Sequence, residues 1–259
     1  LVGPHTRAIV VVHYGGMAVD LDPILDLCRE KGIALIEDAA HATGGRYRDR
    51  PLGGLGDFSC FSFHDTKPIS CGEGGMLCIR DQERVNACEI ILEKGTDRLA
   101  FLRGEKGSYQ WQGLGSSYAA SELQAAVLQA QLQQCEEILE IRQKIWDLYV
   151  SRLGSMGRGF RLPVIRDYSA HNTSVFYIEC ENGEYADFFW NGLRQSGVQA
   201  SFHYPCLHQS PFMKNQSKSS CPHAESWERK LLRLPIHTHM TESDVLFVCE
   251  RMEALIQKI

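Results

Sequence analysis

Two side chains in this sequence, the carboxylate of Asp38 and the amine of Lys67, have types and surroundings that suit covalent cofactor chemistry. Lys67 lies in the stretch FSFHDTKPISCGEGG (61–75), between a short alternating strand and a glycine-rich turn, and Asp38 ends the apolar run IALIED 29 residues earlier. A lysine that forms a Schiff base must approach a carbonyl and lose its proton readily. A pyridoxal ring needs an acid against its ring nitrogen, so that the ring stays protonated and takes up electrons. This pair of residues therefore predicts pyridoxal phosphate as a cofactor.

Each of these residues also has an ordinary structural explanation. Most lysines are solvated, and an acid at a strand end often only caps the next helix. His41 fits a loop position without a role, and Ser62 fits a buried serine bonded to backbone. The prediction therefore depends on the combination of residues and on the elements that position them.

Other reaction chemistries find less support. The sequence contains no G-x-S-x-G, no G-x-x-x-x-G-K-[ST] and no G-x-G-x-x-G after a strand. Cys71 has His64 nearby in sequence, but no pattern supports a thiol nucleophile. His203 and His208 are five residues apart with a proline between them, which is not a helical metal spacing. We therefore expect no metal site.

The N-terminal part of the sequence predicts a β-α-β unit. Residues 8–14 and 33–38 are apolar runs of strand length, and residues 20–32 between them start with Asp/Pro signals and end at a glycine. Such a unit implies parallel strands in a covered sheet, where ligands gather at the carboxyl ends of the strands. Asp38 stands at such an end.

The rest of the chain predicts more elements of the same layered type. Strands are expected at 58–64 and 75–81, a helix at 82–93, and one long helix from about 121 to 153. The run GSMGRGFRLP (154–163) breaks that helix, and we place a domain boundary there: 1–156 as part of a large domain and 157–259 as a small one. Strands at 174–181 and near 198–203, with helices near 184–196 and 241–258, make the second domain α+β.

Composition narrows the class of protein. The 259 residues are 44% hydrophobic and carry a net charge of −5, from 27 basic and 32 acidic side chains, which argues against a nucleic-acid partner. No apolar run approaches the length of a membrane span, so no membrane partner is expected. The chain has ten cysteines, and none of them has C-x-x-C spacing. Several, such as Cys60 and Cys78, lie within apolar runs, which indicates reduced, buried cysteines of a cytoplasmic protein.

A resemblance to a known family strengthens the cofactor prediction. The segment IEDAAHATGGRYRDRPLGGLGDFSCFSFHDTKPISCGEGGML resembles the cofactor-binding core of the nucleotide-sugar aminotransferases of the DegT/DnrJ type, which are fold-type I pyridoxal phosphate enzymes. The resemblance covers nearly the whole chain. It implies an α/β fold: a three-layer, mostly parallel sheet in an aspartate-aminotransferase-like large domain, incomplete at the N-terminus, with a small C-terminal α+β domain.

The resemblance implies roles for individual residues. Lys67 would form the Schiff base and shuttle a proton, and Asp38 would pair with the ring nitrogen. His41 stands where the family usually has Gln, beside the phenolic oxygen of the ring. Ser62 would donate to the cofactor phosphate. Ser117 stands where many members have an Asn that reaches the phosphate in the neighbouring subunit, which implies a homodimer.

The resemblance also implies a substrate class. His203 and Tyr204, in SFHYPCLH (201–208), would border a nucleotide-sugar site. The stretch 93–126 is most similar to the dTDP-4-amino-4,6-dideoxygalactose transaminase branch, which serves enterobacterial common antigen synthesis. The implied reaction transfers an amino group from glutamate to a nucleotide-linked 4-keto-6-deoxy sugar such as dTDP-4-dehydro-6-deoxyglucose.

Two other functions stay open at this point. One is a 3-dehydratase of the same fold, although such enzymes typically replace the lysine with His. The other is a non-catalytic remnant that binds a nucleotide sugar or a partner subunit. The resemblance implies that roughly a hundred residues of the family, its N-terminal third, are absent from this chain, and this favours the remnant.

Overall fold

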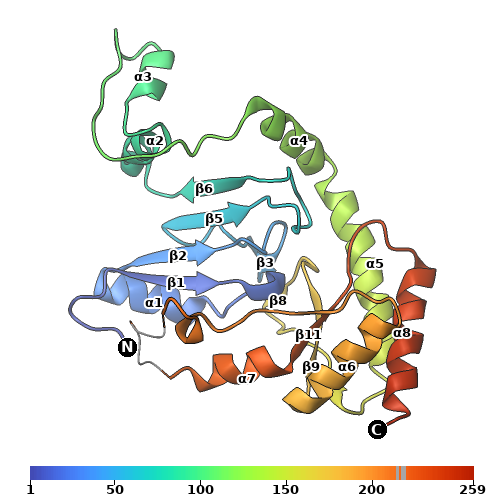
Figure 1. The fold of residues 1–259 in the computed structure, drawn as a ribbon. Coiled ribbons are helices and arrows are strands. Elements are labelled where there is room, and N and C mark those ends of the chain that lie inside the picture. Colours follow the sequence, from blue (N-terminus) through green and yellow to red (C-terminus); the bar gives the residue numbers. More distant parts are fainter. Residues whose placement is uncertain (214–215, 217–219) are drawn as a thin grey trace. The chain divides into compact units, whose positions relative to one another are not determined.

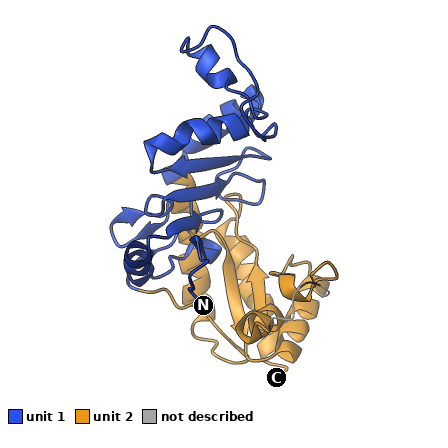
Figure 2. Ribbon diagram, turned by 90° about the vertical axis from the view of Figure 1, so that its left-hand side faces the viewer, with its two compact units in different colours: residues 1–136, 167–172 blue, residues 137–166, 173–259 orange. Residues whose placement is uncertain are grey.

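The computed structural model of the protein describes residues 1–213, 216 and 220–259. The chain forms two compact units, coloured separately in Figure 2. The first contains residues 1–136 and 167–172, and the second contains residues 137–166 and 173–259. Residues 137–156 therefore group with the second unit, whereas the sequence pattern predicted a domain boundary after residue 156.

The first unit is built on a four-stranded sheet with the order β1-β2-β5-β6 (Figure 1). Its strands are β1 (Ala8–Val12), β2 (Ala34–Asp38), β5 (Phe58–Ser62) and β6 (Gly75–Ile79). β1, β2 and β5 are parallel to one another, and β6 runs antiparallel to β5. The predicted parallel β-α-β unit is confirmed, and the carboxyl ends of β2 and β5 lie side by side.

Helix α1 (Asp22–Lys31) covers one face of this sheet. The helix has a proline in its first turn, where the missing N–H costs nothing, and it ends at Gly32 with φ 63° and ψ 37°, a conformation that glycine adopts without strain. Alternate strand residues point toward α1, as expected for a pleated sheet. The core between them contains the buried side chains of Val11, Leu21, Cys28, Leu35, Ala39, Tyr47, Leu52 and Leu55.

The opposite face of the sheet is largely exposed. Val10 and Val12 of β1 are 61% and 48% exposed, and Cys60 of β5 is exposed as well. The sequence analysis was wrong to read Cys60 as a buried hydrophobe, because the alternation of β5 turns it to the face that α1 does not cover. Cys78 is only partly buried. Four other cysteines are buried, as expected: Cys28, Cys180, Cys206 and Cys249.

A small three-stranded sheet joins residues 169–170, which are far away in sequence, to the first unit. The hairpin of β3 (Arg46–Tyr47) and β4 (Arg50–Pro51) pairs with β8 (Ser169–Ala170) in the order β4-β3-β8. The hydroxyl of Ser169 accepts a hydrogen bond of 2.8 Å from the Ala18 amide. Residues 167–172 therefore belong to the first unit, although they follow the first part of the second unit in sequence.

The predicted long helix from 121 to 153 is two helices, α4 (Glu122–Gln133) and α5 (Cys135–Leu153). Gln134 separates them, with φ −103° and ψ 11° outside the helical range. The apolar spacing continues across this residue, so the sequence pattern did not reveal the break. The start of α4 is well marked by a capping box, in which the Ser121 hydroxyl accepts from the Gln124 amide and the Gln124 side-chain oxygen accepts from the Ser121 amide. Before it lie α2 (Val85–Leu92) and α3 (Arg98–Leu102).

The second unit is α+β, as predicted, with an antiparallel sheet of order β10-β11-β9-β7. Its strands are β7 (Phe160–Arg161), β9 (Phe176–Cys180), β10 (Ser201–Phe202) and β11 (Leu231–Leu234). Its remaining helices are α6 (Gly183–Gln195), α7 (Pro222–Lys230) and α8 (Glu242–Ile256). The sequence analysis did not predict α7 and β11. Within the described residues, no helix has the length and apolar character needed to cross a membrane.

Candidate active site

The acid predicted from sequence ends strand β2 at the carboxyl edge of the sheet. The register pairs Asp38 with Val12 of β1 on one side and with Cys60 of β5 on the other. Its Oδ1 accepts a hydrogen bond of 3.1 Å from the Ala40 amide, and the Ala39 amide donates to the Cys60 carbonyl at 2.9 Å. The side chain is partly buried. The backbone around Asp38 is therefore held to the neighbouring strand.

Glu37, the residue before Asp38, lies on the opposite face of β2, the face that α1 covers, and is fully buried. Its carboxylate accepts hydrogen bonds from five groups: His13 Nε2 (2.9 Å), Gly53 N (2.9 Å), Leu55 N (2.7 Å), Gly56 N (2.5 Å) and Ser59 Oγ (3.3 Å). Burial raises the pKa of Glu37, but the bonds from His13 and the three amides outweigh it and lower the pKa from 4.5 to about 2. Glu37 is thus a buried carboxylate that ties β1, β2 and the 53–56 loop together.

Glu37 was not among the residues predicted from the sequence. A signal for it existed, because the period of the strand puts Glu37 on the same face as the buried Leu35. A charged residue at a core position requires partners. The partners come from three separate segments, and only the fold brings them together.

His41 lies in the turn after β2 and is partly buried. Its Nδ1 accepts a hydrogen bond of 3.1 Å from the amide of Gly15, in the short turn that follows β1. Its carbonyl accepts a bond of 2.7 Å from the side-chain amide of Asn172. His41 therefore stands at the same carboxyl edge of the sheet as Asp38.

Ser62 is the last residue of β5, and Lys67 lies in the turn that follows it. The hydroxyl oxygen of Ser62 accepts a long hydrogen bond of 3.4 Å from the His64 amide, and the Lys67 amide donates to the His64 carbonyl at 2.9 Å. Phe63 anchors this turn, since its amide donates to the Gly74 carbonyl and its carbonyl accepts from the Cys71 amide. The side chains of Ser62 and Lys67 are partly buried. The hydroxyl of Ser62 thus stands at the end of the strand next to β2, and the amine of Lys67 is in the turn that follows it.

The three other predicted residues are Ser117, His203 and Tyr204. Ser117 is exposed in the first unit and pairs through its backbone with Glu93. His203 and Tyr204 belong to the second unit, where His203 is buried and Tyr204 is 60% exposed. The structure therefore brings Asp38, His41, Ser62 and Lys67 to one edge of the β1-β2-β5-β6 sheet.

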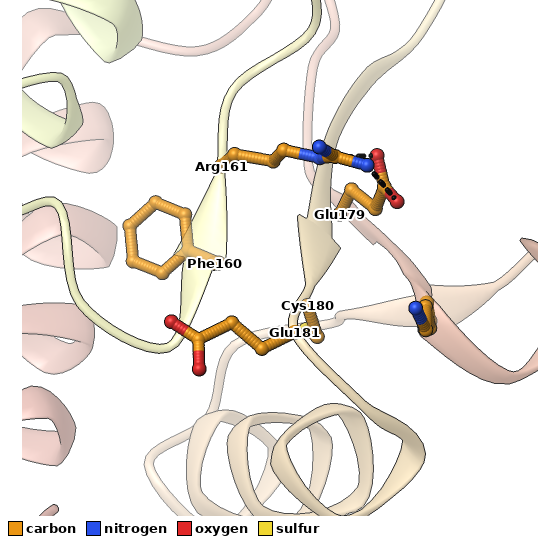
Figure 3. A pocket seen from close by; sticks show the side chains of 6 residues that line it. Phe160, Arg161, Glu179, Cys180 and Glu181 are labelled. Carbon is orange, nitrogen blue, oxygen red and sulfur yellow. Dashed lines mark hydrogen bonds and ion pairs between the residues drawn. The ribbon is translucent and has the colours of Figure 1, made fainter.

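A pocket of about 350 Å³ lies in the second unit, beside strands β7 and β9 (Figure 3). Arg161 lines it and forms a two-pronged ion pair with Glu179, at 2.7 and 2.6 Å. The pocket is also lined by Phe160, Cys180, Glu181 and Lys230. None of the predicted site residues lines it. In the part of the chain that the structure describes, no group of three or more His, Cys, Asp or Glu side chains is arranged to hold a metal ion.

Comparison with known proteins identifies the family. The family model for DegT/DnrJ/EryC1/StrS aminotransferases matches residues 1–253. The chain belongs to the DegT/DnrJ/EryC1/StrS aminotransferase family. This membership confirms the predicted enzyme class and the family named from the sequence motifs.

Among curated relatives of this aminotransferase is the dTDP-4-dehydro-2,3,6-trideoxy-D-glucose 4-aminotransferase of Saccharopolyspora spinosa. It is 28% identical, and the match covers 98% of this chain and 66% of the relative.

Among solved structures, the aminotransferase TlmJ from Streptoalloteichus hindustanus is 29% identical with a TM-score of 0.89, over 99% of this chain and 68% of that one. S. venezuelae DesV, solved in complex with a ketimine intermediate, is 28% identical with a TM-score of 0.88, over 100% of this chain and 67% of that one. These likenesses confirm the predicted fold class. The aminotransferase spans about two thirds of the length of the relatives that it matches.

The donor set at the sheet edge fits pyridoxal phosphate. Lys67 offers an amine for the aldehyde carbon, and Asp38 offers a carboxylate for a protonated ring nitrogen. Ser62 already accepts a bond from the His64 amide, so its hydroxyl hydrogen is available to a phosphate oxygen. His41 offers an imidazole. The chemistry of these four groups therefore suits the cofactor.

Proposed function

We propose that this aminotransferase transfers an amino group from glutamate to a nucleotide-linked 4-keto-6-deoxy sugar, with pyridoxal phosphate as cofactor. The observation that carries the proposal is the arrangement at the sheet edge. Asp38 ends β2, Ser62 ends the adjacent parallel strand β5, and Lys67 lies in the turn that follows β5. Family membership and the substrate in the name of the S. spinosa relative support the sugar as acceptor.

Each residue has a defined task in this proposal. When bound, pyridoxal phosphate supplies an aldehyde that accepts an amino group and a ring that withdraws electrons from the adjacent carbon. Asp38 holds a proton on the ring nitrogen by charge. Ser62 donates a hydrogen bond to a phosphate oxygen. Lys67 would hold the aldehyde carbon through its Nζ. Once the amino group of glutamate has displaced it from that carbon, the neutral Nζ would take the proton from the α-carbon of glutamate as a positioned base.

The finer substrate assignment rests on sequence resemblance. The stretch Glu93–Ala126 resembles the branch that makes dTDP-4-amino-4,6-dideoxygalactose. We therefore propose dTDP-4-dehydro-6-deoxyglucose as the acceptor, bordered by His203 and Tyr204, and a role in polysaccharide synthesis of the enterobacterial common antigen type. A cytoplasmic location suits the ten cysteines, which are all free.

We further propose that the working form is a homodimer in which Ser117 serves the site of the neighbouring subunit. The support is a set of large apolar side chains in the segment before α4 and in its first turn, where Leu114 is 95% exposed and Leu123 is 81% exposed. Trp111 and Tyr118 of the same segment are also exposed. Exposed apolar surface often marks an interaction site.

The experiment that tests the proposal is reductive labelling. The purified protein is incubated with pyridoxal phosphate and treated with sodium borohydride, and its peptides are weighed by mass spectrometry. We expect one pyridoxyl phosphate on the peptide that contains Lys67 and none in the Lys67→Ala variant. Lys31→Ala, which removes an exposed lysine of α1, serves as the matched control and should label like the unchanged protein.

A product assay separates the alternatives. With glutamate and dTDP-4-dehydro-6-deoxyglucose, we expect an amino sugar in which C4 carries nitrogen. A product that has lost its 3-hydroxyl would indicate the dehydratase. A protein that binds the sugar nucleotide without labelling at Lys67 and without turnover would indicate a binding protein and contradict the proposal.

A further inference from the structure

The imidazole of His41 is held by contacts that define which of its nitrogens carries the proton. Its Nδ1 lies 3.1 Å from the backbone nitrogen of Gly15, which donates. A backbone N–H has no acceptor capacity, so Nδ1 must be the unprotonated nitrogen. In a neutral imidazole the proton then resides on Nε2. The ring is therefore a hydrogen-bond donor at Nε2.

The donor amide of Gly15 has a rigid setting. Gly15 lies in the short turn Tyr14–Gly16, is buried and has φ 64° and ψ 12°, a left-handed conformation that favours glycine. The Gly16 amide donates to the His13 carbonyl at 3.1 Å, and the Met17 amide donates to the Tyr14 carbonyl at 3.1 Å. The Gly15 N–H is thus directed by a turn that is closed on both sides.

The side chain of Asn172 holds the backbone carbonyl of His41. Its side chain is 4% exposed, and its Nδ2 donates both hydrogens, to the carbonyl of His41 at 2.7 Å and to that of Thr43 at 2.8 Å. Two carbonyl partners require nitrogen rather than oxygen at this position, which settles the orientation of the amide. A Cβ added to Gly16 would lie 1.7 Å from Asn172 Oδ1, so the side chain packs directly against the glycine turn.

We propose that Gly15 and Asn172 are positioning residues that hold His41 as the Nε2–H tautomer, so that Nε2 donates a hydrogen bond to an anionic ring oxygen of the cofactor. The identity of the acceptor rests on the proposed function. The tautomer itself does not, because both contacts exist within the protein. Asn172, 131 residues away in sequence, thereby becomes part of the machinery around the turn after β2.

The tautomer is tested by nuclear magnetic resonance of ¹⁵N-histidine-labelled protein without added cofactor. Long-range ¹H–¹⁵N spectra distinguish protonated from unprotonated ring nitrogens, and the signals of His41 are those absent from the His41→Gln variant. We expect an unprotonated Nδ1 and a protonated Nε2. A protonated Nδ1, or averaging between both tautomers, would overturn the inference.

The role of Asn172 is tested in the same spectra with a matched control. Asn172→Ala should lose the single-tautomer pattern of His41. Ser169→Ala removes another hydrogen bond of the same segment, to Ala18, and should keep that pattern. An unchanged pattern in Asn172→Ala, or its loss in both variants, would contradict a specific positioning role. Should Asn172→Ala not fold, the spectrum of the unchanged protein still decides the tautomer.

Cofactor affinity tests the donor role separately. The amide nitrogen of Gln reaches the Nε2 position, whereas the oxygen of Asn replaces only the Nδ1 acceptor. We expect the dissociation constant for pyridoxal phosphate to stay within about threefold in His41→Gln and to rise about tenfold or more in His41→Asn, since the acceptor is charged. Equal weakening in both variants would overturn the donor role. If the unchanged protein binds no pyridoxal phosphate, the proposed function fails while the tautomer result stands.

Discussion

His13 and Glu37, both fully buried, are joined by a hydrogen bond of 2.9 Å between Nε2 and Oε2. The Nδ1 of His13 accepts a bond of 3.3 Å from the Val19 amide, so Nε2 is the nitrogen that donates to the carboxylate. The pair connects the end of β1 to β2 one residue before Asp38. The acid proposed to face the cofactor ring is thus positioned by an acid that faces the core.

Stability should therefore depend on the charge of Glu37. Its pKa of about 2 lies below the ordinary 4.5, so the stabilisation is complete above pH 4.5 and is lost as the pH falls toward 2. The shift corresponds to about 3 kcal/mol at neutral pH. Urea unfolding from pH 7 to pH 3 should show a steep fall in the free energy of unfolding.

Glu37→Gln should lower that free energy by about 3 kcal/mol at pH 7 and flatten its pH dependence below pH 5. Glu30→Gln, at an exposed acid of α1, is the control and should change neither quantity appreciably. A pH profile of Glu37→Gln that parallels the unchanged protein would show that another group dominates acid unfolding.

Asp38→Asn should impair catalysis more than folding. The amide keeps the size of the side chain but lacks the charge that holds a proton on the ring nitrogen. We expect the rate of amino transfer to fall about 10²-fold or more, with the free energy of unfolding changed by less than about 1 kcal/mol. Asp65→Asn, an exposed acid in the turn before Lys67, is the matched control. Comparable rates in the two variants would remove Asp38 from the proposed mechanism.

Arg142 should be essential to the second unit as a structural residue. It is buried, and it donates to the carbonyls of Ile236 (3.2 Å), Thr173 (2.9 Å) and Ser174 (2.8 Å). Burial, together with the charge of Arg233, lowers its pKa to about 10. Arg142→Met removes all three donors at once and should cost about 3 kcal/mol in urea unfolding.

Arg152→Met, at an exposed position of the same helix, should cost under about 0.5 kcal/mol. Arg142→Lys keeps the charge but cannot bridge three carbonyls, so an intermediate loss is expected. Equal free energies of unfolding for Arg142→Met and Arg152→Met would show that the three hydrogen bonds of Arg142 do not stabilise the second unit.

The proposed dimer surface predicts a change of mass in solution. If Leu114 and Leu123 were replaced by glutamate, dimer formation would bury two charges in the interface, at a large desolvation cost. The double variant Leu114→Glu/Leu123→Glu should run as a monomer in size-exclusion chromatography with light scattering. Val164→Glu, at a residue of the second unit that is 69% exposed, should leave the mass unchanged. A monomeric unchanged protein, or a double variant that stays dimeric, would reject this surface.

Local pattern alone sufficed for much of the first unit. The apolar runs at β1 and β2 and the start and stop signals of α1 predicted a parallel β-α-β unit, and chain direction then placed Asp38 at the carboxyl edge. The break at Gln134 escaped prediction, because apolar spacing does not record backbone angles. The short α7 and β11 escaped as well, since such short elements carry little periodic signal.

Four chemical groups and their order along the strands can be read directly from the residues: an acid, an imidazole, a hydroxyl and an amine. The polarity of the residues and its repeat along the chain are local properties, so they can be recognised without knowledge of the fold. Only the tertiary structure decided what surrounds those groups. The contacts of Glu37 with residues 53–59, and of Asn172 with His41, join segments far apart in the chain. Such contacts exist only because burial forces distant polar groups to satisfy one another, and no local pattern contains that information.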